Sequence, residues 1–334
     1  MIKLIFKVLI FVFFPGVVLS QTGSITNIAV SQRTDGSGYV DIYYDLAGPG
    51  SSYFISMEVS FNNGNTFTAV STTFLSGNTG VTPDTNRHLI WNGQGSNNNT
   101  YSAQTKVKLF ANITVLCGQP IIDPRDGKSY NTVQLGSHCW MAQNLNIGTK
   151  INGSVNQTNN GIIEKYCYND LESNCDIYGG LFQWGELVQY LNGASNNTSW
   201  NPFPVGNVKG ICPPGWHIPT DSEWCTLTQF LDPTVNCNII GWSGIDLGIK
   251  MKSITGWYNN GNGTNASGFN VLPGGSNGND IYWHLTIYAY FATSTQYSTT
   301  VAWDRNFYYG IGNIGRHNDY GKVGGFSVRC LYDY

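Results

Sequence analysis

Short apolar runs separated by turn residues fill the first third of the chain and predict β-strands. Residues 39–46 have an aromatic and β-branched composition, and residues 53–60 alternate between two sets of side chains. An Asn-Gly turn within residues 62–65 joins the second run to residues 66–70, which is a strong hairpin signal. Two more strands are expected at residues 88–91 and 105–110. The closely spaced turns favour a β-sandwich of immunoglobulin or fibronectin type.

Helical spacing first appears in the second part of the chain. Leu181, Trp184, Val188 and Leu191 recur at the three- and four-residue intervals of an α-helix. The pattern predicts a helix over residues 178–192.

A second helix is predicted to begin after Thr220. Thr220 as N-cap and Glu223 three residues later form a capping-box sequence, and Trp224, Leu227 and Leu231 then line one face. This explains Glu223 as a helix cap. From about residue 256 the chain is rich in Gly and Asn with strand-length aromatic runs, so we expect an α+β domain with long loops.

Residues 1–20 have the layout of a secretory signal peptide. Lys3 and Lys7 precede an apolar run at residues 8–14, which is too short for a membrane span of about 20 residues. We expect cleavage before Gln21. The alternative, a buried or membrane-anchoring helix, is disfavoured by the Pro-Gly pair that follows the run. The predicted location is extracellular or at the cell surface, with the periplasm as the alternative, and no membrane span is expected.

The predicted domains are therefore a signal peptide at residues 1–20, a β-sandwich at 21–115 and an α+β domain at 116–334. All eight cysteines lie after residue 116. In an exported chain an even set of cysteines indicates disulfides, and the C-x2-C pairs of a zinc site do not occur in the sequence. Proximity favours three short loops and leaves one long closure, which gives the pairs Cys117–Cys139, Cys167–Cys175, Cys225–Cys237 and Cys212–Cys330.

Composition narrows the classes of function. Only 11% of the 334 residues are charged and the net charge is −3, so the chain lacks the basic surplus of a nucleic-acid-binding protein. It also has too few charged residues for a coiled coil. With 41% hydrophobic and 14% aromatic residues, it is not a disordered chain. What remains is a mostly β protein whose long loops we expect disulfides to hold.

Six motifs follow one another through the second domain, at residues 126–133, 139–145, 178–184, 212–224, 268–275 and 325–330. Together they resemble the Fibrobacter succinogenes major paralogous domain, which is common in secreted proteins of Fibrobacter and Bacteroidota. The resemblance implies a fold related to C-type-lectin-like domains and formylglycine-generating enzymes, and an export address. Because the family has no settled biochemical role, the resemblance does not imply a particular activity. The N-terminal domain is similar to modules that often precede this family.

The catalytic chemistry of the related enzymes is not expected here. Formylglycine-generating enzymes bind copper with two nearby thiols close to the C-terminus, whereas Cys330 is the only cysteine after Cys237. Many family members carry Trp-Trp-Ser-Ser-Thr-Glu where this chain has residues 290–296, so Gln296 replaces a carboxylate. Neither G-x-S-x-G nor H-E-x-x-H occurs.

Isolated carboxylates and histidines give no catalytic constellation. We expect Glu186 to be solvated and His217 to be a hydrogen-bonded structural residue. The sequence does not place two carboxylates together for glycoside hydrolysis. The acidic candidates are Glu186, Asp221, Glu223, Asp304 and Asp319. No cofactor is predicted, and calcium is left open at the Asn- and Gly-rich loops 259–265 and 277–280.

The strongest functional signal combines aromatic and polar side chains near the C-terminus. Flat rings stack on sugars or proteins, while Asn, Asp and Arg hydrogen-bond polar groups. The candidate ligand-binding residues are Trp283, Trp303, Asp304, Arg305, Asn306, Tyr308, Tyr309, Arg316 and His317. We expect Arg305, Tyr308 and Tyr309 to be exposed, whereas core packing is an equal alternative for Trp257 and Trp303.

These observations predict a secreted or cell-surface recognition protein, without catalytic activity, that binds a glycan or a surface protein. Two alternatives stay open. One is a polysaccharide-acting enzyme or its accessory module, and the other is a structural surface protein. Oligomeric state is not predicted.

Overall fold

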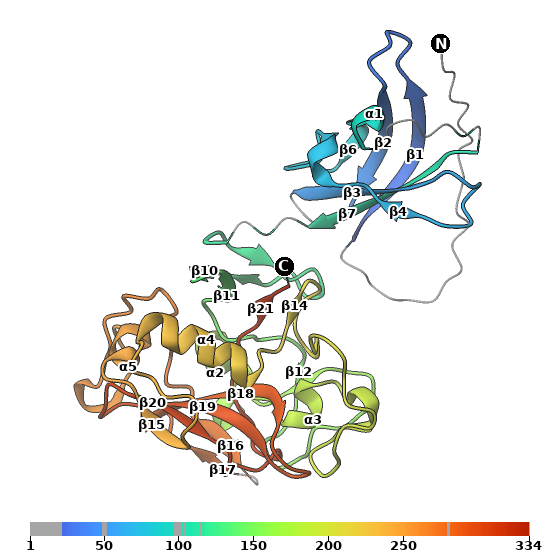
Figure 1. The fold of residues 1–334 in the computed structure, drawn as a ribbon. Coiled ribbons are helices and arrows are strands. Elements are labelled where there is room, and N and C mark those ends of the chain that lie inside the picture. The colour runs from blue at the N-terminus through green and yellow to red at the C-terminus, as the bar shows by residue number, and fades with distance from the viewer. Residues whose placement is uncertain are drawn as a thin grey trace. The chain divides into compact units, whose positions relative to one another are not determined.

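The computed structural model describes residues 22–48, 52–96, 102, 104–113, 115, 117–278 and 281–333. The predicted signal peptide lies outside these residues. The chain divides into two compact units, residues 1–116 and 117–334, and is mostly β with short helices (Figure 1). None of the described helices is long and apolar enough to cross a membrane.

The N-terminal unit is a single curled β-sheet. Its elements are β1 (Thr22–Gln32), β2 (Tyr39–Ala47), β3 (Tyr53–Ser60), β4 (Thr68–Ala69), the 3-10 helix η1 (Thr72–Phe74), β5 (Leu75–Ser76), β6 (Asp84–Asn92), α1 (Gly93–Ser96) and β7 (Lys106–Ile113). The strand order is β4-β3-β7-β1-β2-β6-β5. β1 pairs with β2 from Ser24 to Gln32 and with β7 at Thr22 and Gly23, so this strand joins the two halves of the sheet.

Alternation sets the core of this unit. Tyr53, Ile55, Met57 and Val59 on β3 are buried, and the residues between them are half-buried. The predicted hairpin is confirmed, because β3 pairs with β4. Its turn places Asn63 and Gly64 at φ of 63° and 90°, a left-handed pair that an Asn-Gly sequence adopts at low cost.

The C-terminal unit consists of short strands around one longer sheet. Its strands are β8 (Ile121–Ile122), β9 (Ser129–Tyr130), β10 (Thr132–Leu135), β11 (His138–Met141), β12 (Thr149–Lys150), β13 (Glu164–Lys165), β14 (Trp216–His217), β15 (Gly241–Ser243), β16 (Ser276–Gly278), β17 (Ile281–Trp283), β18 (Tyr288–Gln296), β19 (Ala302–Tyr308), β20 (Ile314–His317) and β21 (Leu331–Tyr332). Its helices are η2 (Tyr168–Asp170), α2 (Glu172–Tyr178), α3 (Trp184–Leu187), η3 (Leu191–Gly193), α4 (Asp221–Leu231), α5 (Leu247–Met251) and η4 (Tyr258–Asn260).

Two four-stranded sheets organise this unit. One has the order β10-β11-β21-β14, and the other is an antiparallel sheet of order β15-β20-β19-β18. Helix α4 packs on the second sheet (Figure 1), where Trp224 lies 5.4 Å from Phe291 between ring centroids. We call the side that faces α4 the inner face and the opposite side the outer face.

The capping box predicted for α4 is confirmed. Thr220 Oγ1 accepts a hydrogen bond from the Glu223 backbone N–H, and the Glu223 carboxylate accepts one from the Thr220 backbone N–H. Trp224 and Leu227 are buried, as the pattern predicts. The helix is therefore fixed at its first turn, which positions Asp221 over the sheet.

The helix predicted over residues 178–192 is wrong. Helix α2 ends at Tyr178, because Gly179 takes a φ of 82°, and Leu181 forms a β-bridge with Tyr166. Helix α3 is then only four residues long, since Gln189 and Tyr190 have left-handed φ values of 53° and 51°. The apolar spacing came from separate segments that each bury one or two side chains.

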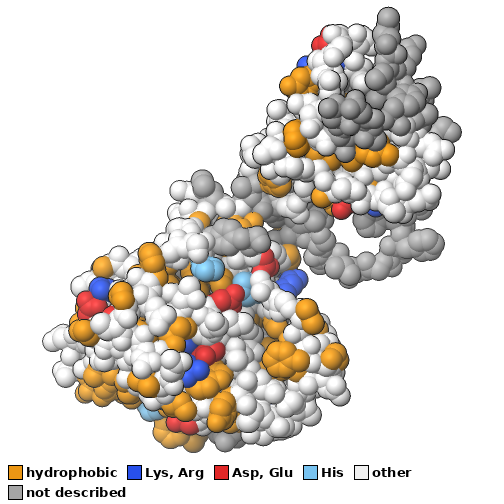
Figure 2. Space-filling view, in the orientation of Figure 1, with side chains coloured by type: hydrophobic (Ala, Val, Ile, Leu, Met, Phe, Trp, Pro, Cys, Tyr) orange, Lys and Arg blue, Asp and Glu red, His pale blue; other side chains and the backbone are white. Residues whose placement is uncertain are grey.

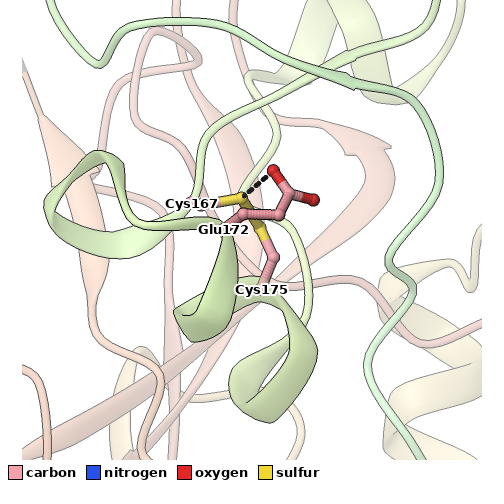
Figure 3. A group of neighbouring side chains, drawn as sticks. All are labelled: Cys167, Glu172 and Cys175. Carbon is pink, nitrogen blue, oxygen red and sulfur yellow. Dashed lines mark hydrogen bonds between the residues drawn. A yellow bond between two sulfur atoms is a disulfide. The ribbon is translucent and has the colours of Figure 1, made fainter.

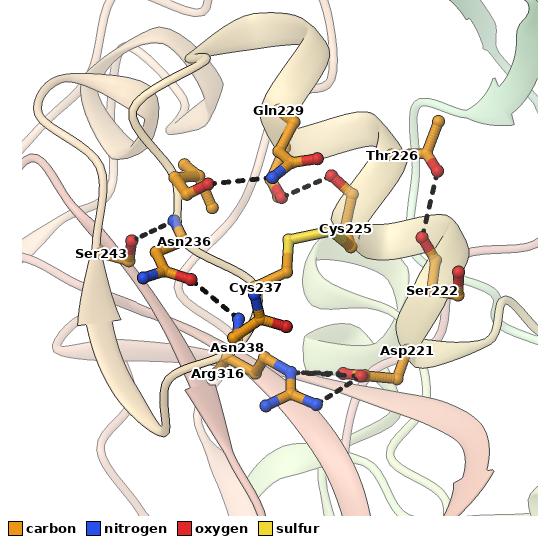
Figure 4. The surroundings of a disulfide bond; sticks show 12 residues. Asp221, Ser222, Cys225, Thr226, Gln229, Asn236, Cys237, Asn238, Ser243 and Arg316 are labelled. Carbon is orange, nitrogen blue, oxygen red and sulfur yellow. Dashed lines mark hydrogen bonds and ion pairs between the residues drawn. A yellow bond between two sulfur atoms is a disulfide. The ribbon is translucent and has the colours of Figure 1, made fainter.

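All four predicted disulfides are present. They join Cys117 to Cys139, Cys167 to Cys175, Cys212 to Cys330 and Cys225 to Cys237. Figure 4 shows the last pair, which ties α4 to the loop after it, next to the ion pair between Asp221 and Arg316.

A buried arginine joins several of the family-like motifs. Arg329 Nε donates to Asn144 Oδ1 at 2.7 Å, and its Nη2 donates to the Asn270 carbonyl at 2.9 Å. Burial lowers the pKa of Arg329 to about 9. Such polar contacts inside the unit leave a visible surface with few charged side chains, as Figure 2 shows.

Candidate functional site

Most of the predicted ligand-binding residues lie on β19 and β20. Asp304 pairs with His317 and Arg305 pairs with Arg316, so the register places each pair on one face of the sheet. Alternation then puts Arg305 and Arg316 on the inner face with α4, and Asp304, Asn306 and His317 on the outer face. The predicted cluster is therefore divided between two environments.

The inner-face arginines bind the start of α4. Arg305 Nη1 lies 2.6 Å from Asp221 Oδ1, and Arg316 Nη2 lies 2.7 Å from Asp221 Oδ2. The expectation that Arg305 is exposed is wrong, since the residue is only 2% exposed. A guanidinium taken out of water needs a carboxylate partner, and Asp221 supplies one to both arginines. Arg305 and Asp221 therefore have a structural role.

Trp303 is held by the same group. The Arg316 guanidinium carbon lies 3.5 Å from the Trp303 ring centroid, and the Tyr297 ring packs edge-on to Trp303 at 5.4 Å. Trp303 is half-buried. Its flat face is thus covered by a cation within the chain.

On the outer face, Asp304 is buried to 1% exposure and Asn306 is equally enclosed. They are not the surface hydrogen-bonding groups that the sequence suggested. Within the described part of the chain, neither Asp304 carboxylate oxygen has a hydrogen-bond partner, and Asn306 Oδ1 and His317 Nε2 also lack one. Four buried polar atoms without partners are an unusual cost at one place in a fold.

Burial governs the charge of these groups. It raises the pKa of Asp304 well above its usual range, and the nearby Asp319 raises it further. Burial likewise lowers the pKa of His317. Burial therefore favours the neutral form of both side chains.

A continuous row of rings crosses the outer face. Successive ring centroids lie 6.1, 5.0, 4.7, 4.5 and 5.3 Å apart. We call this row the aromatic strip, and its members in order are Trp283, His284, Tyr288, Tyr308, Tyr309 and Tyr258. Trp283 and Tyr258, at its two ends, are 48% and 55% exposed, whereas Tyr308 and Tyr309 are half-buried.

A strained turn presents one end of the strip. His284 and Thr286 have φ values of 66° and 64°, which is an uncommon conformation for a β-branched residue such as Thr286. The turn is fixed because the Thr286 N–H donates to the Pro273 carbonyl and the Thr286 carbonyl accepts from the Tyr258 N–H, both within 3.0 Å. Strain of this kind persists where the surrounding structure imposes it, and it often accompanies a functional surface.

At the other end of the strip, a buried lysine holds the backbone in place. Lys252 Nζ donates to the carbonyls of Tyr308, Tyr309 and Ile311 at 3.1 to 3.2 Å. Burial lowers the pKa of Lys252 to about 8. Its charge is directed at backbone carbonyls.

The strip itself is electrically neutral. Burial lowers the pKa of His284, and a hydrogen bond in which the Tyr308 hydroxyl donates to Tyr309 helps to raise the pKa of Tyr308 to about 12. At pH 7 its surface therefore offers ring faces, hydroxyl groups and an uncharged imidazole.

A small pocket opens beside Asp304, lined in part by Trp184, Trp303, Tyr320 and Lys322. Lys322 Nζ donates to Gln296 Oε1 and to the Thr299 carbonyl, each at 2.9 Å, and lies 3.9 Å from the Trp184 ring centroid. Burial lowers the pKa of Lys322 to about 8. Gln296, the position that departs from the family-like pattern, thus gives this buried lysine a neutral partner.

Among the described residues, Glu186 and Glu223 are engaged by other parts of the C-terminal unit. The expectation that Glu186 is solvated is wrong, because it is buried on α3, accepts a hydrogen bond from the Glu164 N–H at 3.1 Å and has a pKa raised by burial. Glu223 caps α4 and also contacts His217 Nε2 at 3.0 Å. His217 Nδ1 contacts Asp333 at 2.6 Å, so His217 is structural, as predicted.

One group in the described residues has the proximity of a metal site, namely Cys167, Glu172 and Cys175. Figure 3 shows that the two sulfur atoms are bonded to each other, so neither is a thiolate ligand. Glu172 instead pairs with Lys165 at 2.9 Å. Of the loops left open for calcium, residues 279 and 280 lie outside the described residues, and the buried Asn277 donates to the Gly153 carbonyl.

The sequence reasoning missed two residues of the outer face. They are Trp242 and Tyr288. Tyr288 could have been found, because alternation along residues 288–291 puts it on the same face as Tyr290. Trp242 gives no such signal, since β15 joins the sheet from a distant segment, where its ring lies 6.5 Å from Tyr308 and 5.6 Å from His317.

Comparison with known proteins identifies the C-terminal unit. No curated protein and no solved structure matches the chain. The family model of the Fibrobacter succinogenes major domain matches residues 133–332, which include both four-stranded sheets and the aromatic strip. The chain therefore belongs to the Fibrobacter succinogenes major domain family.

Proposed function

We propose that the protein is a recognition protein that binds a neutral glycan through the aromatic strip. The observation that carries the proposal is the row of six contacting rings, with exposed rings at both ends. Rings stack on the apolar faces of sugars, and their hydroxyl groups hydrogen-bond sugar hydroxyls. A chain of rings suits an extended oligosaccharide better than a single sugar.

The chemistry of the strip favours an uncharged ligand. Lys252, which lies against the backbone of the strip, is bound to backbone carbonyls, and Arg316 on the inner face is bound to Asp221. The lowered pKa of His284 leaves that ring neutral at pH 7. Recognition of sulfated or uronic-acid glycans would need free Arg or Lys side chains.

The role is proposed for an exported protein. In this proposal residues 1–20 are the signal peptide and the mature chain works outside the cell or at its surface, with the periplasm as the alternative. The proposal includes an immunoglobulin-like sandwich for the N-terminal unit and a C-type-lectin-like fold for the C-terminal unit. The curled N-terminal sheet and the disulfide-linked loops support these assignments.

A hydrolytic role is less well supported. Asp221 is bound to two arginines, and Glu223 is bound to His217 and the start of α4. Asp221 and Glu223 are therefore not free to act as a pair of catalytic carboxylates. If the strip bound a protein instead of a glycan, the experiment below would show no glycan binding.

An array of neutral and anionic glycans, probed with the full mature chain, tests the proposal. We expect neutral oligosaccharides to be retained, with the signal lost in Trp283→Ala and Tyr258→Ala. Tyr297→Ala is the matched control, because Tyr297 is 58% exposed and lies outside the strip. Retention of anionic glycans alone, no retention at all, or equal losses in the control would contradict the proposal.

A further inference from the structure

Beneath the outer face, four buried atoms that can all bind a cation lie without partners. They are both carboxylate oxygens of Asp304, Oδ1 of Asn306 and Nε2 of His317. None has a partner at full hydrogen-bonding geometry among the described residues, although the Asn306 side chain lies close enough to Asp304 to lower its pKa. None belongs to the aromatic strip. Buried groups of this kind are normally satisfied by protein, water or a bound ion.

The sheet register brings the three side chains together. Asp304 and His317 are directly paired on β19 and β20, and Asn306 follows Asp304 by two residues on the same face. Gly315 pairs with Asn306 and leaves the space between them open. A Cβ at Gly315 would lie 2.7 Å from His317 Nε2 and 3.2 Å from Asn306 Cβ, so His317 Nε2 points toward Asn306 across this glycine.

The second ring nitrogen of His317 is oriented as in many metal sites. His317 Nδ1 faces Asp319 Oδ1 at 3.8 Å. A metal-binding histidine commonly directs its other nitrogen toward a carboxylate, which fixes the ring orientation. Nε2 is then left to face the cluster.

Apart from the Asn306 side chain, which faces Asp304, the neighbouring donors described below are directed elsewhere. Tyr290, the neighbour of Asn306 across β18, directs its hydroxyl group to His284 Nδ1 at 2.9 Å. Arg305 lies on the opposite face, bound to Asp221. Asp304 also lines a small pocket together with Tyr320 and Lys322.

We propose that Asp304, Asn306 and His317 bind a divalent transition-metal cation of the Zn²⁺ or Mn²⁺ type. The ligand set is one carboxylate, one amide oxygen and one imidazole nitrogen. An imidazole ligand suits Zn²⁺ and other transition metals, whereas Ca²⁺ prefers oxygen ligands throughout. The cation would join β19 to β20 under the strip, next to Trp242, which contacts both His317 and Tyr308.

This site is independent of the glycan proposal, so its test uses no glycan. Full mature chain is stripped with chelator, and then ZnCl₂, MnCl₂ and CaCl₂ are titrated separately by calorimetry, with metal content checked by mass spectrometry. We expect one Zn²⁺ or Mn²⁺ per chain. We expect Asp304→Asn and His317→Gln each to weaken binding at least 100-fold.

Two matched variants control for surface binding. His138→Gln removes a histidine on β11, in the other four-stranded sheet, and Asp246→Asn removes the exposed carboxylate that pairs with Lys250. Both should bind metal as the wild type does. If Asp304→Asn does not fold, His317→Gln decides the outcome. The proposal is overturned if no transition metal binds, if Ca²⁺ binds in preference, or if binding survives in the Asp304 and His317 variants.

Discussion

Arg305 on β19 donates to Asp221 at the first turn of α4, with 2.6 Å between Nη1 and Oδ1. Arg316 on β20 binds the other oxygen of the same carboxylate. One acidic side chain therefore joins the helix to two strands of the sheet. It also explains why two residues that looked like surface ligand contacts are part of the framework.

Replacing Asp221 should destabilise the C-terminal unit strongly. Asp221→Ala leaves the buried Arg305 without its carboxylate, and removal of one partner from a buried pair costs about 3 kcal/mol or more. Asp246→Ala breaks the exposed pair with Lys250 and should cost less than about 1 kcal/mol. Urea denaturation of both variants measures the difference, and equal losses would show that the buried triad is unimportant.

His217 should make stability depend on pH. Burial alone would lower its pKa, but the hydrogen bonds that His217 donates to Asp333 and Glu223 outweigh burial and raise the pKa to about 9. A histidine with a raised folded-state pKa stabilises the protein fully below the unfolded value of about 6.5, and this contribution is lost as pH rises through 9.

The test compares wild type with His217→Gln by denaturation at pH 6, 7.5 and 9.5. The advantage of the wild type should shrink steadily with rising pH, by an amount on the order of 3 kcal/mol over the whole range. His138→Gln is the control and should keep the wild-type pH dependence. A difference between wild type and His217→Gln that is constant with pH would exclude this role for His217.

The long disulfide should stabilise more than the shortest one. Cys212 and Cys330 are separated by 118 residues, whereas Cys167 and Cys175 are separated by 8. Chain entropy gives about 5 kcal/mol for the long closure and about 2.5 kcal/mol for the short one. Paired Cys→Ala variants, compared by thermal unfolding, should follow that order, and the reverse order would contradict it.

Gln296→Glu should give the buried Lys322 a charged partner. Gln296 Oε1 already accepts from Lys322 Nζ at 2.9 Å. Because burial lowers the pKa of Lys322 to about 8, wild-type stability gains from this lysine as pH rises from 8 toward 10.5. The glutamate should raise that pKa and remove the gain.

Denaturation of the wild type and Gln296→Glu at pH 7 and pH 10 checks this point. The variant should be relatively more stable at pH 7 than at pH 10. Gln134→Glu, a substitution of the same kind in the other four-stranded sheet, is the control. A variant with the pH profile of the wild type would show that Lys322 does not respond to residue 296.

Local signals in the sequence predicted the elements they specify. Asn63-Gly64 formed the expected hairpin, Thr220 and Glu223 capped α4, and loop lengths gave all four cysteine pairs. These features depend on a few neighbouring residues. The helix expected at residues 178–192 failed because two glycines and left-handed residues interrupt it, although its apolar side chains are mostly buried.

The sequence predicted where along the chain the candidate site lies, but not which face of the sheet each side chain occupies. The aromatic residues near the C-terminus do gather on one sheet. Arg305 and Asp304 are neighbours in the sequence, and alternation along β19 means that they cannot lie on the same face. The register of β19 with β20 assigns them to opposite faces. The partner of Arg305 lies 84 residues away on α4, and no local pattern marks such a contact.

The measurement that tests the central claim most directly is a calorimetric titration of neutral oligosaccharides into the full mature chain, Trp283→Ala and Tyr297→Ala. We predict binding by the wild type and by Tyr297→Ala with the same affinity. Trp283→Ala should bind at least ten times more weakly, a loss of about 1.4 kcal/mol. No binding by the wild type, or equal affinity in all three proteins, would contradict the assignment of the aromatic strip as the glycan site.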